Sequence, residues 1–95
     1  MALTRFIYRF ELSNTAAKLV LYSRVGCHLC DVMIADLRDL QTNPPFDLEI
    51  VDVDSSPALK ARYGRRIPVL ASGKTEICCY QLDVAKLNDF LSKSR

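Results

Sequence analysis

Residues 19–31 read LVLYSRVGCHLCD, and this stretch decides the fold of the chain. Its first part is an apolar, β-prone run that is typical of a buried strand, and Gly26 indicates a tight turn after that strand. Further along, apolar residues recur at spacings of three and four, which predicts an amphipathic helix through Cys30, Met33, Ile34, Leu37 and Leu40. The sequence therefore predicts a strand, a turn and a helix that has Cys27 at its first position.

Two cysteines separated by two residues, Cys27 and Cys30, indicate thiol chemistry at this place. The amide protons of the first helical turn and the helix dipole present partial positive charge to the Cys27 sulfur, so Cys27 is the expected nucleophile. Cys30 lies one turn deeper on the same face and is the expected resolving thiol, which attacks the mixed disulfide formed at Cys27.

The two residues between the cysteines also bear on the site. His28 can carry positive charge beside the Cys27 thiolate and so tune the redox poise of the pair. The alternative is that His28 points into solvent and has little effect. Leu29, where it is exposed, would supply an apolar contact for a partner.

The rest of the chain predicts three further strands and two further helices. Asn43-Pro44-Pro45 stops the first helix, and a serine followed by Pro57 starts a short one that Gly64 ends. Asp83 is the expected N-cap of the last helix. The expected strands span 46–53, 68–71 and 75–80, with Ser72-Gly73-Lys74 as a hairpin loop, and the expected helices span 57–63 and 84–91. The order β-α-β-α-β-β-α predicts an α/β fold with a mixed four-stranded sheet.

Residues 1–17 are expected to form an N-terminal extension, and residues 18–95 the domain itself. Within the extension, the aromatic and aliphatic residues Phe6, Tyr8, Phe10 and Leu12 recur at every second position, which predicts an extra strand; the residues between them are Arg5, Ile7, Arg9 and Glu11. The alternative is a cleaved organelle presequence, since the segment has two arginines and a single acid.

Arg66-Ile67-Pro68 stands at the entry to the third expected strand of the domain. Proline cannot donate a hydrogen bond to a strand ladder, and a cis peptide bond before Pro68 is the common way to accommodate it. With Pro68 in the cis form, the backbone N–H and C=O of Ile67 would be free to pair with an extended thiol substrate.

The composition of the 95 residues excludes several classes of protein. Apolar residues make up 49% and charged residues 25%, which are ordinary globular values and exclude a disordered chain. The longest run without a charged residue is seven residues, far below the roughly 20 of a membrane helix. A net charge of +2 gives no reason to expect nucleic acid or a membrane as the partner. A working dithiol without a signal-peptide core fits a reducing interior, so the expected location is cytoplasmic.

The stretches 19–31 and 62–70 resemble the thioredoxin superfamily, and most closely its glutaredoxin-like proteins. The resemblance covers the chain from Lys18 to Leu91. It implies a thioredoxin/glutaredoxin-like fold and a thiol–disulfide oxidoreductase that reduces protein or glutathione mixed disulfides. Glutathione or a thiol reductase is then the expected electron donor, no cofactor is bound tightly, and the protein is expected to be a monomer.

The same resemblance implies roles for individual residues. Cys27 is the attacking cysteine, Cys30 the resolving one, and Pro68 the cis proline, with Ile67 supplying backbone contacts to substrate. Arg24 matches a position where glutaredoxins carry a lysine that binds a glutathione carboxylate.

The chain departs from the family just before its last helix. Glutaredoxins usually have a Gly-Gly pair followed by an aspartate there, which holds the γ-glutamyl carboxylate of glutathione. Here residues 79–83 read CYQLD, which leaves Asp83 as the only candidate for that contact. Redox chemistry is therefore better supported than specificity for glutathione.

Cys78 and Cys79 are adjacent in an expected strand, so their side chains should point to opposite faces. They are expected to be structural thiols. The alternative is a zinc site of four thiolates shared with Cys27 and Cys30, which the opposed directions disfavour. For the chain as a whole, the alternative to an enzyme is a non-catalytic thioredoxin-fold binding module or a redox sensor, and a structural zinc protein comes third.

Overall fold

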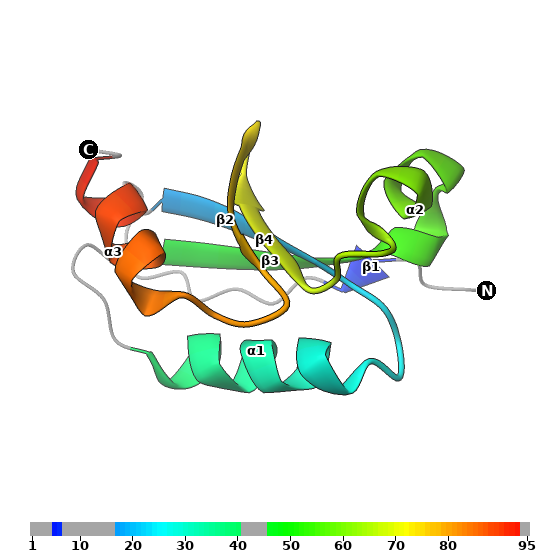
Figure 1. Cartoon of the computed structure of the whole chain (residues 1–95), viewed down its shortest axis with the longest axis horizontal. Coiled ribbons are helices and arrows are strands. Elements are labelled where there is room, and N and C mark those ends of the chain that lie inside the picture. The colour runs from blue at the N-terminus through cyan, green and yellow to red at the C-terminus, as the bar shows by residue number, and fades with distance from the viewer. Residues whose placement is uncertain (1–4, 7–16, 41–45, 94–95) are drawn as a thin grey trace.

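The computed structural model describes residues 5–6, 17–40 and 46–93 of the chain (Figure 1). One sheet holds five strands, in the spatial order β1-β3-β2-β4-β5: β1 (Arg5–Phe6), β2 (Ala17–Ser23), β3 (Phe46–Asp52), β4 (Val69–Ser72) and β5 (Thr75–Cys79). Three α-helices and one short 3-10 helix complete the fold: α1 (His28–Asp39), η1 (Val53–Ser55), α2 (Pro57–Tyr63) and α3 (Val84–Lys93). None of the helices described is long and apolar enough to cross a membrane.

The sheet is mixed, as predicted. β2 and β3 run parallel, from Ala17 opposite Phe46 to Ser23 opposite Asp52, and α1 makes the crossover between them. β4 is antiparallel to β2, and β5 is antiparallel to β4. β1 adds two antiparallel residue pairs to the outer edge of β3. The predicted N-terminal strand is therefore present at residue 6, while the rest of the alternating segment lies outside the described residues.

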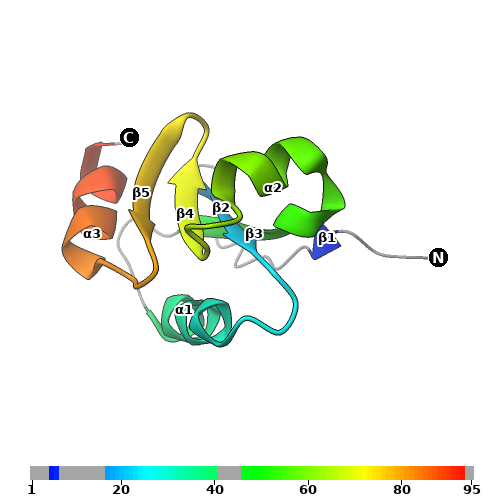
Figure 2. The same cartoon turned by 45° about the vertical axis from the view of Figure 1, so that its right-hand side comes forward.

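The helices lie on both faces of the sheet, and Figures 1 and 2 show α1 and α2 on opposite sides of it. The main core cluster joins α1 and α3 to one face, and residues such as Met33, Leu70 and Leu87 are almost completely buried in it. A second, smaller cluster of Val53, Tyr63 and Val69 packs α2 and η1 against the other face. The alternation of side chains along β2 and β4 supplies apolar residues to both clusters.

The β4–β5 hairpin differs from the prediction in its turn. Ser72 pairs with Thr75, so the loop is the two residues Gly73 and Lys74 rather than the three that were expected. Gly73 has φ +57, a left-handed conformation that glycine adopts at no steric cost. The register of strand pairing sets the length of this loop, and that register depends on the partner strand as well as on the loop sequence.

A β-bulge lies in β5, where Leu70 pairs with Cys78 and Ala71 pairs with Glu76. Ile77 is the extra residue, and the bulge lets both Ile77 and Cys78 contact the main core cluster. Cys79 packs against the second cluster on the other face of the sheet. The prediction that the two adjacent cysteines point to opposite faces is confirmed.

The starts of α2 and α3 follow the predicted caps. The Ser56 hydroxyl accepts a hydrogen bond from the Leu59 amide at 3.4 Å, with Pro57 at the first helical position. The Asp83 carboxylate accepts one from the Lys86 amide at 3.0 Å. Both caps satisfy amides that have no partner inside the helix, which is why these residue types are found there.

Replacing Leu87 by Ala tests the packing of α3. Leu87 is completely buried against the sheet, so its truncation leaves a cavity and should lower the free energy of unfolding by about 2–5 kcal/mol. Val84→Ala is the control on the same helix, at an exposed position, where a change within about 0.5 kcal/mol is expected. Urea denaturation followed by circular dichroism measures both variants. Equal losses of stability in the two would contradict this packing.

Candidate functional site

A tight turn connects β2 to the dithiol segment. The Cys27 amide donates a hydrogen bond to the Arg24 carbonyl oxygen at 3.2 Å, which closes a four-residue turn. Gly26 occupies the third position of this turn with φ +83, the left-handed conformation that type II turns require. Because a Cβ added at Gly26 would meet no neighbour within 4 Å, the need for glycine is conformational. The turn places Cys27 at the carboxyl end of β2.

Cys27 is the N-cap of α1, one residue before the helical position predicted for it. Its backbone is extended, with φ −87 and ψ 113, and its carbonyl oxygen accepts a hydrogen bond from the Asp31 amide. The Cys27 sulfur accepts a hydrogen bond from the Cys30 amide at 3.3 Å. A cap residue folds its side chain back over the first turn, so the sulfur occupies the place that a serine oxygen takes in other caps. One amide of the first turn, that of Cys30, therefore faces this sulfur.

Cys30 has a different environment although it lies only one turn away. Its side chain is completely buried, and burial raises the pKa of the Cys30 thiol to about 11. This value includes a smaller upward contribution from a hydrogen bond with Cys27 and downward contributions from hydrogen bonds with Ser23 and with the Arg24 backbone. Cys30 therefore carries its proton at neutral pH. Its role as the resolving thiol stays a prediction, and its protonation state is the one that role requires.

The segment before β4 adopts the predicted backbone. The Ile67–Pro68 peptide bond is cis, Pro68 is buried, and Ile67 packs at the margin of the second core cluster. Within the described part of the chain, no hydrogen bond joins the Ile67 amide or carbonyl to another residue. The binding of substrate by Ile67 stays a prediction, and these two backbone groups are available for it.

Arg24 forms an ion pair that sequence reasoning missed. Its Nε lies 2.9 Å from Asp54 Oδ2, and a second guanidinium nitrogen lies 3.1 Å from Asp54 Oδ1. This two-point contact lowers the pKa of the Asp54 carboxyl and raises that of Arg24. Arg24 was predicted to bind a glutathione carboxylate, and that role stays a prediction. An incoming carboxylate would have to share the guanidinium with Asp54.

His28 and Asp83 lie at the starts of two different helices. His28 is the exposed first residue of α1, beside Cys27, and its tuning role stays a prediction. The Asp83 carboxylate caps α3, and its predicted contact with glutathione is likewise untested. The structure thus brings Cys27, Cys30 and His28 together at one helix end.

Tyr80 is a second residue that the sequence did not single out. Its only signal there was that the Gly-Gly pair usual in glutaredoxins is missing from residues 79–83. Its φ of +68 lies in the left-handed region, which a bulky residue seldom adopts. Its hydroxyl donates to the Arg65 carbonyl at 3.2 Å, and its amide donates to the Pro68 carbonyl at 2.9 Å. Both ends of Tyr80 are therefore tied to the segment that holds Pro68, while its side chain remains 48% exposed.

Cys78 and Cys79 do not extend the dithiol site. Burial raises the pKa of the Cys78 thiol, as expected for a cysteine that fills space. Across residues 5–6, 17–40 and 46–93, no group of three or more His, Cys, Asp or Glu side chains is placed to hold a metal ion. The alternative of a shared four-thiolate zinc site therefore has no support among these residues.

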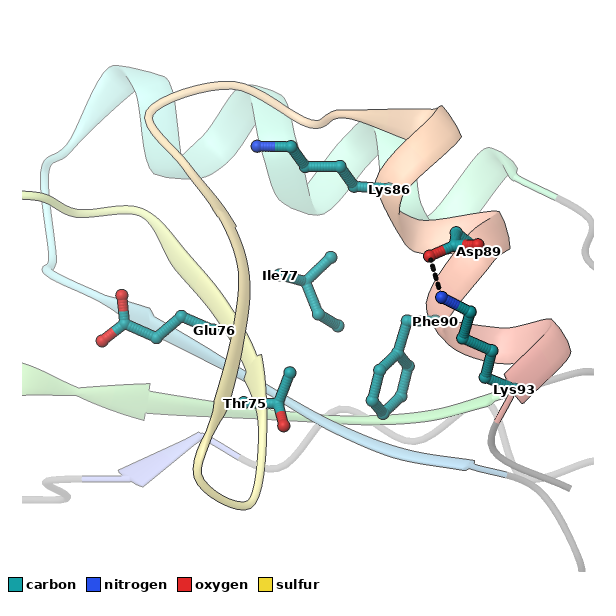
Figure 3. Close-up of a pocket in the computed structure, with 7 residues that line it drawn as sticks. All are labelled: Thr75, Glu76, Ile77, Lys86, Asp89, Phe90 and Lys93. Atoms are coloured by element: carbon teal, nitrogen blue, oxygen red, sulfur yellow. Dashed lines mark ion pairs between the residues drawn. The ribbon is translucent and has the colours of Figure 1, made fainter.

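A separate hollow of about 380 Å³ lies between β5 and α3 (Figure 3). Ile77 and Phe90 project into it, and an ion pair of 3.1 Å between Lys93 and Asp89 lies on its helical side. The residues that line this hollow include none of those predicted for the dithiol site. The chemistry predicted from the sequence therefore lies elsewhere, at the junction of β2 and α1.

Residues 18–92 match the family described as Glutaredoxin-like domain (DUF836). Protein Ne2328 from Nitrosomonas europaea, known from a solution NMR structure, is 39% identical, with a TM-score of 0.73; the match covers 86% of this chain and 99% of that one. The uncharacterized protein Rv0508 from Mycobacterium tuberculosis is 29% identical over 79 residues, which are 78% of this chain and 81% of its own.

Thioredoxin 1 from Thermosipho africanus is similar in fold alone. It is 17% identical, with a TM-score of 0.54, over 80% of this chain and 91% of its own. The mixed sheet, the three helices and these matches together give a thioredoxin-like fold, as predicted.

The two thiols should differ sharply in their reaction with iodoacetamide, which alkylates the thiolate form of cysteine. A pKa of about 11 leaves about one Cys30 thiol in a thousand ionised at pH 8, so brief treatment should modify Cys27 and leave Cys30 almost untouched. Modification of Cys30 should then rise about tenfold for each pH unit up to that pKa. Peptide mass spectrometry measures both sites, and protein unfolded in urea serves as the control. Equal modification of the two at pH 8 in folded protein would contradict the burial of Cys30.

Proposed function

Because this chain belongs to the glutaredoxin-like domain family, we propose that it is a thiol–disulfide oxidoreductase that reduces protein or glutathione mixed disulfides through Cys27 and Cys30. The observation that carries the proposal is the position of Cys27 as the N-cap of α1, with the Cys30 amide 3.3 Å from its sulfur. An N–H donor and a helix N-terminus stabilise negative charge on the atom that has to attack. The fold and the spacing of the two cysteines are compatible with this redox chemistry.

The reaction proceeds by two thiol–disulfide exchanges. The Cys27 thiolate attacks one sulfur of the substrate disulfide, a Cys27–substrate bond forms, and the other substrate sulfur leaves as a thiolate that takes a proton from water. Cys30 then loses its proton and attacks the Cys27 sulfur, which releases the second substrate thiol. The substrate gains two electrons and two protons, and the protein is left with a Cys27–Cys30 disulfide. Two molecules of glutathione, or a dithiol reductase, return the pair to the reduced form.

The surroundings of the pair separate the two steps. Cys27 is half-buried at the helix end and is open to a substrate, whereas Cys30 is buried and holds its proton. In the second exchange the Cys27 sulfur is the atom that Cys30 attacks, and the substrate thiolate is the leaving group. Ile67, whose backbone amide and carbonyl make no hydrogen bond within the described part of the chain, would pair with an extended substrate chain.

Arg24, Asp83 and His28 are proposed to tune this activity. Arg24 and Asp83 would contact the charged ends of glutathione if it is the electron donor, and His28 would bias the redox poise through its charge. A dithiol that reduces disulfides has to be returned to its reduced form, which a reducing compartment favours, and we propose the cytoplasm as the location on that ground.

The competing function is a non-catalytic binding module or redox sensor with the same fold. In that case Cys27 and Cys30 would be oxidised and reduced without catalytic turnover, and the N-cap position of Cys27 would favour its oxidation in a redox sensor. The partial exposure of Cys27 favours the enzyme, because a thiol that a substrate can reach can pass electrons repeatedly.

Serine substitutions at the two cysteines separate these functions. Cys27→Ser should reduce the rate of disulfide reduction by about a hundredfold or more, because the nucleophile is lost. Cys30→Ser should instead accumulate a mixed disulfide between Cys27 and the substrate, visible as an added mass that dithiothreitol removes. The assays are reduction of insulin by dithiothreitol and of a glutathionylated peptide by glutathione with glutathione reductase. Cys79→Ser is the control and should keep full activity. Wild-type protein without turnover in either assay would leave the binding module as the better proposal.

Substitution of a charged residue tests whether Arg24 binds glutathione. Asp54→Asn removes the carboxylate that holds the guanidinium, so the KM for glutathione should fall about threefold to tenfold, and Arg24→Ala should raise it. Asp39→Asn, at an exposed position of α1, is the control and should leave the KM unchanged. An unchanged KM in both Asp54→Asn and Arg24→Ala would remove Arg24 from glutathione binding. A reduction potential near −200 to −230 mV, rather than about −270 mV, would independently favour glutathione as the donor.

A further inference from the structure

Exposed apolar side chains gather beside the dithiol. Among the described residues, the large hydrophobic side chains with high exposure are Val25, Leu29, Val32, Tyr80 and Val84. Three of them, Leu29, Val32 and Tyr80, line one groove although they come from distant parts of the chain. Apolar residues scattered singly on a surface need no explanation, whereas these three share one groove.

The groove lies between α1 and the segment that joins β5 to α3, and its volume is about 250 Å³. α1 supplies Leu29, Val32 and the buried Met33 to the groove, and Leu82 contributes from the other side. This volume lies below the roughly 300–1,000 Å³ of small-molecule sites, so the groove suits a side chain of a longer segment.

Tyr80 gives the groove one rigid wall. Its backbone amide is bound to the Pro68 carbonyl, and its hydroxyl is bound to the Arg65 carbonyl at 3.2 Å. A side chain held at both ends loses little further freedom when a partner packs on it, which lowers the entropic cost of binding. The groove is therefore formed before a substrate arrives.

The charge in the groove selects for a cation. Asp36 is the one charged residue that lines it, and among the described residues no ion pair involves the Asp36 carboxylate. Gln81 is the other polar lining residue and is neutral. A glutathionyl group carries two carboxylates and one ammonium, a net negative charge that Asp36 would repel. A lysine or arginine side chain would be attracted.

Two of the residues that line the groove are linked to the candidate site. Leu29 lies two residues after Cys27 in the first turn of α1, and Tyr80 is bonded to Pro68, next to the free backbone groups of Ile67. A strand-like substrate advances about 3.3 Å per residue, so a chain that pairs with Ile67 can reach the groove within a few residues.

We propose that this groove binds an apolar side chain with a neighbouring basic residue, both belonging to a protein substrate whose disulfide is attacked by Cys27. The assignment rests on the proposed function and names the class of substrate: a protein segment with an apolar-basic pair near its cysteine. A glutathione mixed disulfide of a small molecule has neither feature.

Synthetic peptides with one cysteine bound to thionitrobenzoate test the proposal. Attack by Cys27 forms the Cys27–peptide disulfide and releases coloured thionitrobenzoate, so the rate constant is read directly. Peptides with Leu-Lys on both sides of the cysteine should react about tenfold faster than those with Leu-Glu at low salt, and the difference should shrink at high salt. Val32→Ser should slow the Leu-Lys peptide about fivefold while changing a Ser-Ser peptide little.

Charge reversal in the groove supplies the matched comparison. Asp36→Lys should invert the preference so that the Leu-Glu peptide reacts faster. Asp39→Lys puts the same charge at another exposed position of α1 and should keep the wild-type order. Equal rates for all peptides, together with no effect of Asp36→Lys, would overturn the substrate class and leave the dithiol chemistry intact.

A binding measurement tests the groove independently of the thiol–disulfide exchange. Leu-Lys peptides with serine in place of cysteine, added to isotope-labelled protein, should shift the NMR signals of Leu29, Val32 and Tyr80. The same shifts should be lost in Asp36→Lys but not in Asp39→Lys. Shifts confined to other surfaces would overturn the groove assignment. If these NMR shifts are present but wild-type protein releases thionitrobenzoate no faster than Cys27→Ser does, the proposed function is overturned and the groove assignment stands.

Discussion

The hydrogen bond from the Cys30 amide to the Cys27 sulfur depends on where α1 begins, and the sheet fixes that point. β2 is buried in the middle of the sheet and ends at Ser23, and a turn that requires left-handed Gly26 brings the chain back within four residues. α1 then packs its apolar face on the sheet through residues such as Met33. Cys27 is left as the cap, because it is the last residue with an extended backbone before the helix.

One helical turn separates two thiols with opposite properties. The Cys27 sulfur is half-buried and accepts an amide hydrogen bond, while the Cys30 thiol is buried and has a pKa of about 11. Both environments follow from the same packing of α1, since the helix end faces outward and the next turn faces the sheet. The proposed chemistry needs this asymmetry, because in it the first thiol has to attack a substrate and the second has to wait for the mixed disulfide.

Elements that depend on residues close together in the sequence could be predicted. The strand-turn-helix at 19–31, the Ser56 and Asp83 caps and the cis peptide at Pro68 all follow from periodicity, capping or the missing amide of proline. The start of the first helix was predicted at Cys27, one residue too early, and the hairpin loop was predicted one residue too long. Both errors concern boundaries, which depend on strand register and helix packing.

The sequence by itself determined that a Cys-x-x-Cys pair stands at a strand-to-helix junction, since local patterns place both cysteines within one turn of the same helix. Only the tertiary structure decided what surrounds that pair. Arg24 meets Asp54 across 30 residues, and Tyr80 is bound to Arg65 and faces α1 across the groove. The physical reason is that such contacts form only when packing of the sheet and helices brings distant segments together, and no periodicity in the chain records which side chains will then meet.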